Sequence, residues 1–171
     1  GCFLDGPVVY PGACYCPTCR GLFARQTGQD RMPAWADWTD PLWKRFTRFR
    51  AQSWADYMRD AQSAAREINP DAVIFLNGGH AHPSALNTAR DPYLLEPFQT
   101  FNGSEEFFHC GTGYDSPYKS LNLARFLSAG SNPAVVFTHH TLSTWHYNPL
   151  PKAEMVLAMA SAVAGGANTW F

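Results

Sequence analysis

Short apolar runs that end in polar clusters recur along the chain, with helix-like stretches between them. The runs and the clusters after them are Gly1-Cys2-Phe3-Leu4 before Asp5-Gly6, Ala72-Val73-Ile74-Phe75-Leu76 before Asn77-Gly78-Gly79-His80, Phe98-Gln99-Thr100-Phe101 before Asn102-Gly103-Ser104-Glu105-Glu106, and Ala134-Val135-Val136-Phe137 before Thr138-His139-His140. A fifth run covers residues 168–171. Short buried strands that alternate with helices are typical of parallel βα units. Because such sheets carry their chemistry at the carboxyl ends of strands, the polar clusters are the candidate site.

The helices are predicted from caps and from apolar spacing. Asp40 is a good N-cap and Pro41 suits the first helical position, and apolar residues then recur at helical spacing as far as Ile68. Two further helices are predicted: one begins at Ser116-Pro117 and ends at Gly130, and one runs from about residue 152 to residue 164. The intervening stretches 5–39 and 77–97, and the one before residue 151, are expected to be loops.

Two architectures fit such units: an open doubly wound sheet and part of an eight-stranded barrel. No Gly-rich phosphate-binding sequence follows a strand, which disfavours a nucleotide-binding sheet. Long polar and aromatic loops favour the barrel instead. We therefore expect an α/β fold, a partial TIM (β/α)8 barrel containing parallel strands four to eight. Since the sequence begins and ends on apolar runs, we expect residues 1–171 to be a single domain from a larger barrel whose N-terminal half is missing.

Composition narrows the range of partners. The formal net charge is -1, and no cluster of Lys and Arg indicates a nucleic-acid partner. No apolar run approaches the roughly 18–20 residues that cross a membrane. Aromatic residues make up 15% of the chain, which suits a carbohydrate partner because sugar faces stack on rings. Core packing is the alternative role for these rings. Localisation and oligomeric state stay open.

Carboxylates at two strand ends are the candidate catalytic groups. Asp5 suits a nucleophile or a general acid/base, and its alternative role is to cap the following loop. Glu105 and Glu106 cannot point the same way in an extended chain, so we expect one of them to face the site. Two carboxylates across a sugar-sized cleft are the minimal device for glycoside hydrolysis.

Other polar and aromatic residues near the strand ends are expected to bind substrate. They are Asn77, His80, His139, His140, Trp145 and Trp170. A neutral His can bind a hydroxyl or tune a nearby carboxylate. The sequence His80-Ala81-His82 leaves a second possibility open, a metal-dependent hydrolase that also uses His139.

Three thiols lie within six residues, at Cys14, Cys16 and Cys19. This spacing predicts a metal site, and a structural zinc would pin the long loop beside the candidate site. Cys2, Cys110 or a Cys in a missing N-terminal part would supply the fourth ligand. A disulfide with one leftover thiol and three free thiols are the alternatives.

The Cys loop followed by Phe23 resembles the zinc loop after strand four of family 42 beta-galactosidases and of related hypothetical glycosyl hydrolases. Those enzymes carry Asn-Glu at the end of strand four and a nucleophilic Glu after strand seven, where this chain has Leu4-Asp5-Gly6 and Thr138-His139-His140. Their catalytic residues therefore do not carry over. The sequence Phe3-Leu4-Asp5-Gly6 is closer to the strand-four motif of alpha-L-fucosidases, which implies that Asp5 is the nucleophile.

The sequence thus predicts a glycoside hydrolase that acts on O-glycosidic bonds with retention. Asp5 would be the nucleophile and Glu105 or Glu106 the acid/base. A non-catalytic carbohydrate-binding barrel is the alternative, and the metal-dependent hydrolase is a third possibility.

Overall fold

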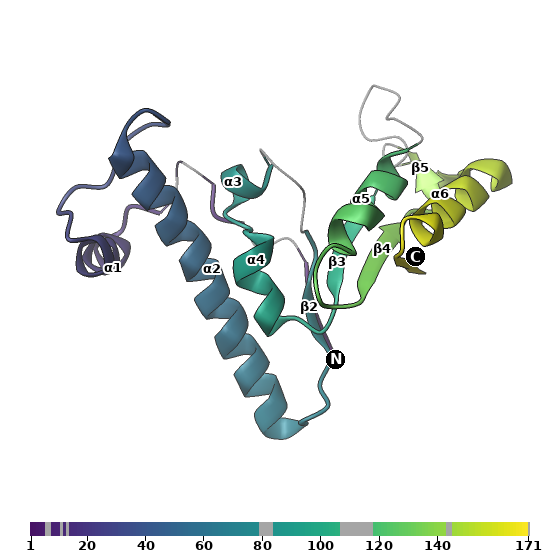
Figure 1. Ribbon diagram of the computed structural model, residues 1–171, viewed down its shortest axis with the longest axis horizontal. Coiled ribbons are helices and arrows are strands. Elements are labelled where there is room, and N and C mark those ends of the chain that lie inside the picture. The colour runs from purple at the N-terminus through teal and green to yellow at the C-terminus, as the bar shows by residue number, and fades with distance from the viewer. Residues whose placement is uncertain are drawn as a thin grey trace.

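The computed structural model describes residues 1–5, 8–10, 12, 14–78, 84–106, 118–142 and 145–170. The helices are α1 (Pro17–Thr27), α2 (Pro41–Ile68), α3 (Ser84–Thr88), α4 (Pro92–Leu95), α5 (Lys119–Leu127) and α6 (Lys152–Ala164), with a 3-10 turn η1 (Glu96–Phe98). The strands are β1 (Cys2–Leu4), β2 (Ile74–Leu76), β3 (Asn102–Glu106), β4 (Ala134–Thr138), β5 (Thr141–Leu142), β6 (Trp145–Pro149) and β7 (Asn168–Trp170). Figure 1 shows α2 on one side and the α5–α6 pair on the other, with β2 and β3 between them.

The expected half-barrel is wrong. The described strands form a parallel pair β1-β2, a parallel three-stranded sheet β3-β4-β7, and an antiparallel hairpin β5-β6, rather than one five-stranded sheet. A single parallel bridge between Asn77 and Gly103 links the first two sheets. Within the β1-β2 and β3-β4-β7 sheets, neighbouring strands are nevertheless parallel.

Side chains supply part of the bonding between β2 and the segment before β3, where a regular backbone ladder would run in a continuous sheet. Ile74 N donates to Thr100 Oγ1 at 3.1 Å, and Leu76 N donates to Gln99 Oε1 at 2.9 Å. These two donors would otherwise pair with carbonyls of a neighbouring strand. The chain at Gln99 and Thr100 therefore satisfies β2 without itself being a strand, and β3 begins only at Asn102.

The third strand thus lies later than the sequence pattern predicts. The expected strand at 98–102 is a turn and a bend, and Gly103 and Glu105, expected in the loop after it, lie inside β3. By contrast, α2 begins at the Asp40 cap and ends at Ile68 as predicted, because Asp40 Oδ1 accepts from Leu42 N at 2.8 Å. The predicted bounds of α6 are also confirmed.

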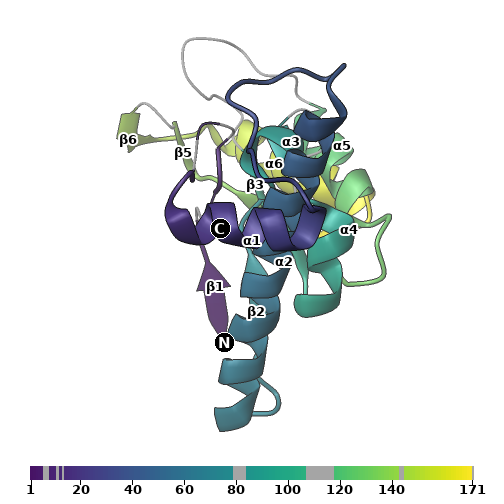
Figure 2. The same cartoon turned by 90° about the vertical axis from the view of Figure 1, so that its left-hand side faces the viewer.

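The two halves of α2 pack on different partners. Its first half forms a core with α1 that contains Phe23, Trp43, Phe46 and Phe49. Its second half covers the β1-β2 sheet through Trp54 and Met58. Figure 2 shows α1 crossing in front of α2, in a stretch that the sequence pattern assigns to a loop. A separate core at the far end contains Leu123, Leu127, Val136 and Ala162, from β4, α5 and α6.

The buried Arg50 side chain links α2 to the segment after β1 and to α3. The side chain is 2% exposed and donates to Val9 O at 2.8 Å and to Leu86 O at 2.9 Å. Its guanidinium lies 5.3 Å from the Phe46 ring centroid and 5.9 Å from that of Trp43.

Within the described part of the chain, no helix combines the length and apolar character needed to cross a bilayer.

Candidate functional site

Polar residues at the carboxyl ends of four strands share one face with a layer of aromatic rings. Side chains two residues apart on a strand point to the same side. The aromatic positions are Phe3, Phe75 and Phe137, and the polar positions two residues further along are Asp5, Asn77 and His139. Glu105 is opposite Phe137 in the register of β3 and β4, which places it on the same face. One face therefore carries a layer of rings with polar groups at its edge. We call this layer the aromatic floor, and it consists of Phe3, Phe75, Phe137 and Trp170.

The aromatic floor brings the two sheets together. The Phe3 ring centroid lies 4.9 Å from that of Phe75, 5.4 Å from that of Phe137 and 5.7 Å from that of Trp170. In a flat sheet, β1 and β7 would be roughly 19 Å apart, across four strand spacings of about 4.8 Å. The sheets therefore incline toward each other. Trp170 is 48% exposed and Phe3 is 38% exposed, so part of the floor is open to solvent.

Gly103 makes room for these rings. A Cβ at this position would lie 3.0 Å from Phe137 Cζ and 3.2 Å from Phe75 Cδ2. Contacts this short need the rings to move, so a larger residue would disturb the floor. The glycine is thus a packing requirement of β3 and not a loop residue, contrary to the sequence prediction.

Asn77 connects the two candidate carboxylate positions. Its Nδ2 donates to Asp5 Oδ1 at 2.8 Å, and its Oδ1 accepts from Glu105 N at 3.1 Å. Its backbone N–H also donates to Leu4 O at 2.9 Å. The side chain is 6% exposed, so a single buried amide orients the Asp5 carboxylate and fixes the backbone of Glu105.

Arg90 is a site residue that the sequence analysis missed. It is 7% exposed, and its guanidinium lies against the backbone of Gly78. Burial lowers the pKa of Arg90, while the charges of Tyr10, Asp5 and Glu105 act in the opposite direction. A cation is therefore buried close to both carboxylates. The signal is absent from the sequence because an Arg ahead of Asp91-Pro92 is indistinguishable from a surface residue.

His139 extends the polar group on the β4 side. Its Nε2 lies 3.7 Å from Glu105 Oε1, and the two side chains are 32% and 34% exposed. This separation exceeds that of a direct hydrogen bond, and the attraction is ionic only when the His is protonated. His140 is exposed, and it lines a small cavity of about 70 Å³ beside α6 together with His139, Met155 and Met159.

Several predicted site residues cannot be added to this geometry. His80, His82 and Cys110 lie outside the described residues. Glu106 and Trp145 are described as strand positions of β3 and β6 only. Of the predicted residues, the structure brings together Asp5, Asn77, Glu105 and His139, and it places Trp170 in the aromatic floor.

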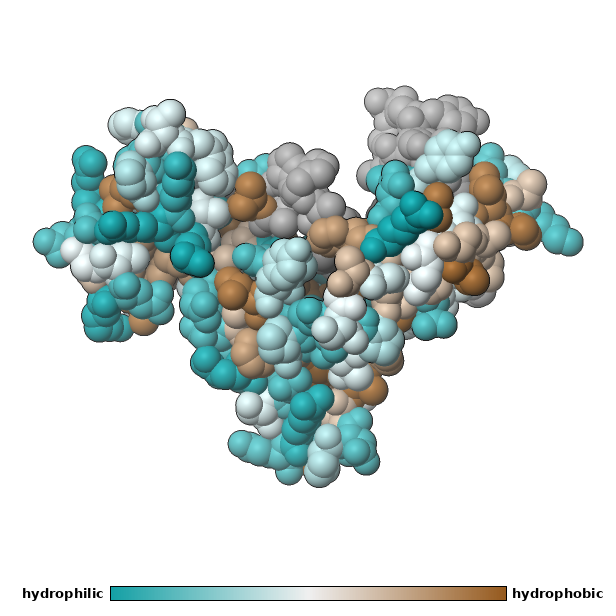
Figure 3. Space-filling model, in the orientation of Figure 1, coloured by the Kyte–Doolittle hydropathy of each residue, from teal (hydrophilic) through white to brown (hydrophobic). Residues whose placement is uncertain are grey.

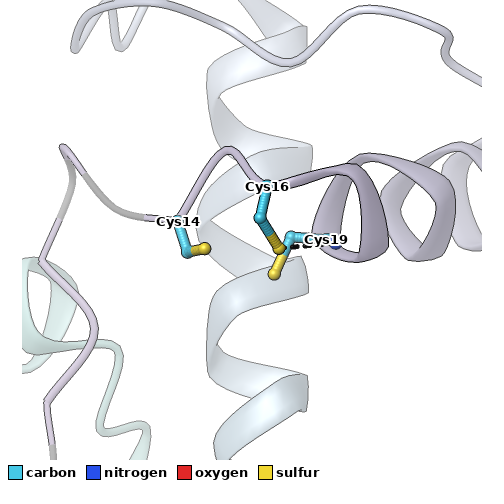
Figure 4. A group of neighbouring side chains, drawn as sticks. All are labelled: Cys14, Cys16 and Cys19. Carbon is cyan, nitrogen blue, oxygen red and sulfur yellow. Dashed lines mark hydrogen bonds between the residues drawn. The ribbon is translucent and has the colours of Figure 1, made fainter.

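The three clustered cysteines can bind a metal. The Sγ atoms of Cys14, Cys16 and Cys19 all lie within 4.8 Å of one another. Figure 4 shows Cys14 pointing from the preceding segment toward Cys16 and Cys19 at the start of α1. Cys16 is the N-cap of that helix, and its Sγ accepts from Cys19 N at 3.4 Å. Cys2, a candidate fourth ligand, lies in β1 and is not part of this group.

The surroundings shift the pKa values of Cys16 and Cys19 in opposite directions. Hydrogen bonds from Cys19 N and from the neighbouring thiols lower the pKa of Cys16 to about 7. Burial and the neighbouring sulfurs raise the pKa of Cys19 to about 12. A bound cation would reverse the second shift, because metal ligation requires deprotonated sulfur.

Comparisons with known proteins give no relative of this chain. No protein family, no curated protein and no solved structure matches it.

Proposed function

We propose that the chain is a glycoside hydrolase in which Asp5 and Glu105 are the reacting carboxylates. The observation that carries the proposal is the Asn77 side chain, which bonds to Asp5 through Nδ2 and to the Glu105 backbone through Oδ1. A shared buried amide holds the two acidic residues in a fixed relationship, as paired acid and nucleophile chemistry requires.

Asp5 is the proposed nucleophile. It attacks the anomeric carbon and forms a covalent glycosyl-enzyme, which water then hydrolyses with retention of configuration. Its hydrogen bond from Asn77 orients the carboxylate for attack.

Glu105 is the proposed acid/base. It protonates the leaving oxygen in the first step and takes a proton from water in the second. His139 Nε2 lies 3.7 Å from Glu105 Oε1, close enough to affect proton transfer to and from Glu105. The partly exposed rings of Phe3 and Trp170 would stack on the sugar, because they lie on the same face as the carboxylates.

The test uses aryl glycosides whose leaving groups differ in basicity. We expect Asp5→Ala to lower turnover by several orders of magnitude on every hydrolysed substrate. Glu105→Gln should lower turnover about 10²- to 10⁴-fold when the leaving group is a poor one, and much less when it is dinitrophenolate, which leaves without protonation. Azide should rescue Asp5→Ala with an inverted product and Glu105→Ala with a retained one.

Exposed acids far from the strand ends provide matched controls. Asp71 precedes β2 and Glu67 lies in the last turn of α2, and both are exposed. Asp71→Asn and Glu67→Gln should keep the activity of the parent chain. Near-normal turnover of Asp5→Ala would refute the nucleophile assignment.

A non-catalytic carbohydrate-binding protein is the second candidate, favoured by the exposed part of the aromatic floor. It predicts sugar binding without turnover, and binding that is indifferent to Asp5→Asn combined with Glu105→Gln. A metal-dependent hydrolase would need His80 and His82, which the structure does not describe.

We also propose that the metal at Cys14, Cys16 and Cys19 is a structural zinc. In a tetrahedral zinc site with bonds of about 2.3 Å, the sulfurs lie about 3.8 Å apart, so the three thiols need only a small inward shift. Cys2, Cys110 or a thiol from outside this sequence remains the fourth ligand. One zinc per chain in the purified protein, lost on substitution of Cys14, is the expected result.

A further inference from the structure

Three adjoining hollows lie beside α2, α4 and α5. The first reaches Gly78 and Gly103, next to the candidate site, and the second and third lie along α2. The first, of about 350 Å³, is bounded by residues from α4, β3 and α5. The second, of about 500 Å³, shares Pro92, Tyr93 and Phe126 with the first. The third, of about 510 Å³, shares Arg48 with the second. Shared walls mean that the hollows adjoin, so an elongated ligand can occupy more than one.

The floor of the middle hollow holds a buried hydroxyl with unused hydrogen-bonding capacity. Thr47 is 8% exposed and lines this hollow, and its Oγ1 has no hydrogen-bond partner among the described residues. A helical Thr commonly donates to the carbonyl four residues earlier, which is not the case here. A buried hydroxyl without a partner is costly, so a ligand that bonds to it recovers that free energy.

Positive charge borders the second and third hollows, whereas the first is lined by Glu96 and, among the described residues, by no cation. Lys44 and Arg48 line the second, Arg45 and Arg48 line the third, and all three side chains are exposed. The stretch of α2 from residue 41 to residue 55 contains no Asp or Glu. Asp91 lines the second hollow, but its Oδ1 accepts from Tyr93 N and caps α4. The surface therefore favours an anionic ligand.

Aromatic rings complete the wall of the middle hollow. Trp38 is 48% exposed and Tyr93 is 84% exposed, and Phe126 lies between this hollow and the first. Figure 3 shows apolar brown surface beside hydrophilic teal surface where α2 and α4 lie. Flat apolar faces next to cations and a hydroxyl match a sugar that carries a carboxylate, since sugar rings stack while their hydroxyl and carboxyl groups bond at the edges.

We propose that this surface binds an acidic oligosaccharide of several uronic acid units, apart from the catalytic residues. Lys44, Arg45 and Arg48 pair with the carboxylates, and Thr47 bonds to a sugar hydroxyl. The choice of a sugar over other anions rests on the proposed glycosidase function. The charge, the buried hydroxyl and the adjoining hollows do not rest on it.

The test is calorimetric titration of the Asp5→Asn protein with a galacturonic acid hexamer, so that no cleavage occurs. We expect saturable binding that weakens as salt rises, and at least tenfold weaker binding of the fully methyl-esterified hexamer, which has the same sugar backbone without the charge. Lys44→Ala combined with Arg48→Ala should weaken binding of the acid at least tenfold. Arg66→Ala, which removes an exposed cation at the far end of the same helix, should leave it unchanged.

Thr47→Val separates a ligand-binding role from a structural one. The variant should bind the hexamer about three- to tenfold more weakly, because one hydrogen bond is lost. The same variant should be as stable as the parent or more stable, because an unpartnered buried hydroxyl is removed. A structural role would instead lower stability and leave binding of the folded protein unchanged.

Three outcomes would overturn the proposal: equal binding of the acid and its ester, binding that is unaffected by the Lys44 and Arg48 substitutions, or tighter binding of a uridine hexanucleotide than of the sugar. The proposed glycosidase function fails separately, through retained turnover in Asp5→Ala. If the Asp5→Asn protein binds the hexamer but the parent chain hydrolyses no glycoside, only the binding surface is supported. If the parent chain hydrolyses glycosides but the hexamer does not bind, only the catalytic pair is supported.

Discussion

The guanidinium of Arg90 lies in the space that a side chain at position 78 would occupy. A Cβ on Gly78 would collide with Arg90 Nη1, and it would lie 2.9 Å from Cζ. Gly78 has a φ of 112°, and Ala89, just before Arg90, has a φ of 61°. A glycine and a rarely populated backbone conformation at an Ala thus both serve to place one buried cation beside Asp5 and Glu105.

Gly78→Ala should therefore destabilise the fold by more than its backbone conformation alone explains. A left-handed conformation costs a non-Gly residue roughly 1–2 kcal/mol, and displacing the packed guanidinium should add about 1–3 kcal/mol. Chemical denaturation measures the loss. Gly28→Ala is the matched control, because Gly28 has a φ of 68° with open space around it. Gly12→Ala controls for substitution without either effect.

A double-mutant cycle isolates the contact with Arg90. In the Arg90→Ala background, Gly78→Ala should cost about as much as Gly28→Ala, because the collision is gone. Equal losses for Gly78→Ala in both backgrounds would show that Arg90 is not what excludes a side chain there.

Asn77→Asp should weaken the fold at neutral pH and much less at acidic pH. The substitution replaces the donor to Asp5 with a second carboxylate, so the repulsion raises the pKa of the pair above its unfolded value. The cost is then absent below the unfolded pKa and develops as pH rises through the folded one. We expect a loss of about 2 kcal/mol at pH 7. Asn122→Asp, at an exposed position within α5, should show a much smaller pH dependence.

Local signals predicted α2, α6 and much of the strand pattern, whereas α1, α3 and α4 lie in stretches that were expected to be loops. The bounds of α2 follow from the Asp40 cap and from apolar spacing, and both are properties of nearby residues. The position of β3 was wrong because Gln99 and Thr100 bond to β2 through side chains, an arrangement that a run of apolar residues does not reveal. The prediction of a half-barrel was wrong for the same reason. The expected continuous sheet is interrupted between β2 and β3, where only a single bridge joins the two sheets among the described residues.

The candidate site could be predicted only where strand ends carry it. Asp5, Asn77 and His139 follow apolar runs, so their shared edge was foreseeable. Arg90 and Thr47 were not foreseeable, because Arg90 packs against Gly78 and the hollow that Thr47 lines is completed by residues of α4 and α5. Contacts between residues distant in sequence leave no pattern in a single chain.

Glu96→Ala should lower stability by about 2–3 kcal/mol at neutral pH. The Glu96 carboxylate accepts hydrogen bonds from Ser131 N, from Asn132 N at 3.1 Å and from Asn102 Nδ2 at 3.0 Å, so its removal leaves three donors without this partner. These bonds lower the pKa of Glu96. The stabilisation is therefore present above the unfolded pKa and is lost as pH falls through the folded one.

Measuring the free energy of unfolding from pH 7 down to pH 3 checks both the size of the Glu96 contribution and its dependence on pH. The difference in free energy of unfolding between the parent protein and Glu96→Ala should become smaller as the pH falls. Glu67→Ala, at an exposed position on α2, should differ little from the parent at any pH in that range. A gap that widens toward acid would contradict the proposed role of the carboxylate.

Removal of zinc with a chelator should lower the melting temperature without removing catalytic activity from protein that stays folded. The cysteines lie at the start of α1, and α1 packs on α2 through Phe23, so a metal there stabilises that packing. Zinc affinity should fall as pH drops through about 7, the pKa of Cys16, because protons then compete for its sulfur.

Cys14→Ser and Cys19→Ser should each reproduce the loss of melting temperature in the presence of zinc. Cys2→Ser decides the fourth ligand: an equal loss assigns Cys2, and an unchanged melting temperature excludes it. A chelator that abolishes turnover while the melting temperature stays constant would contradict a structural metal and favour a catalytic one.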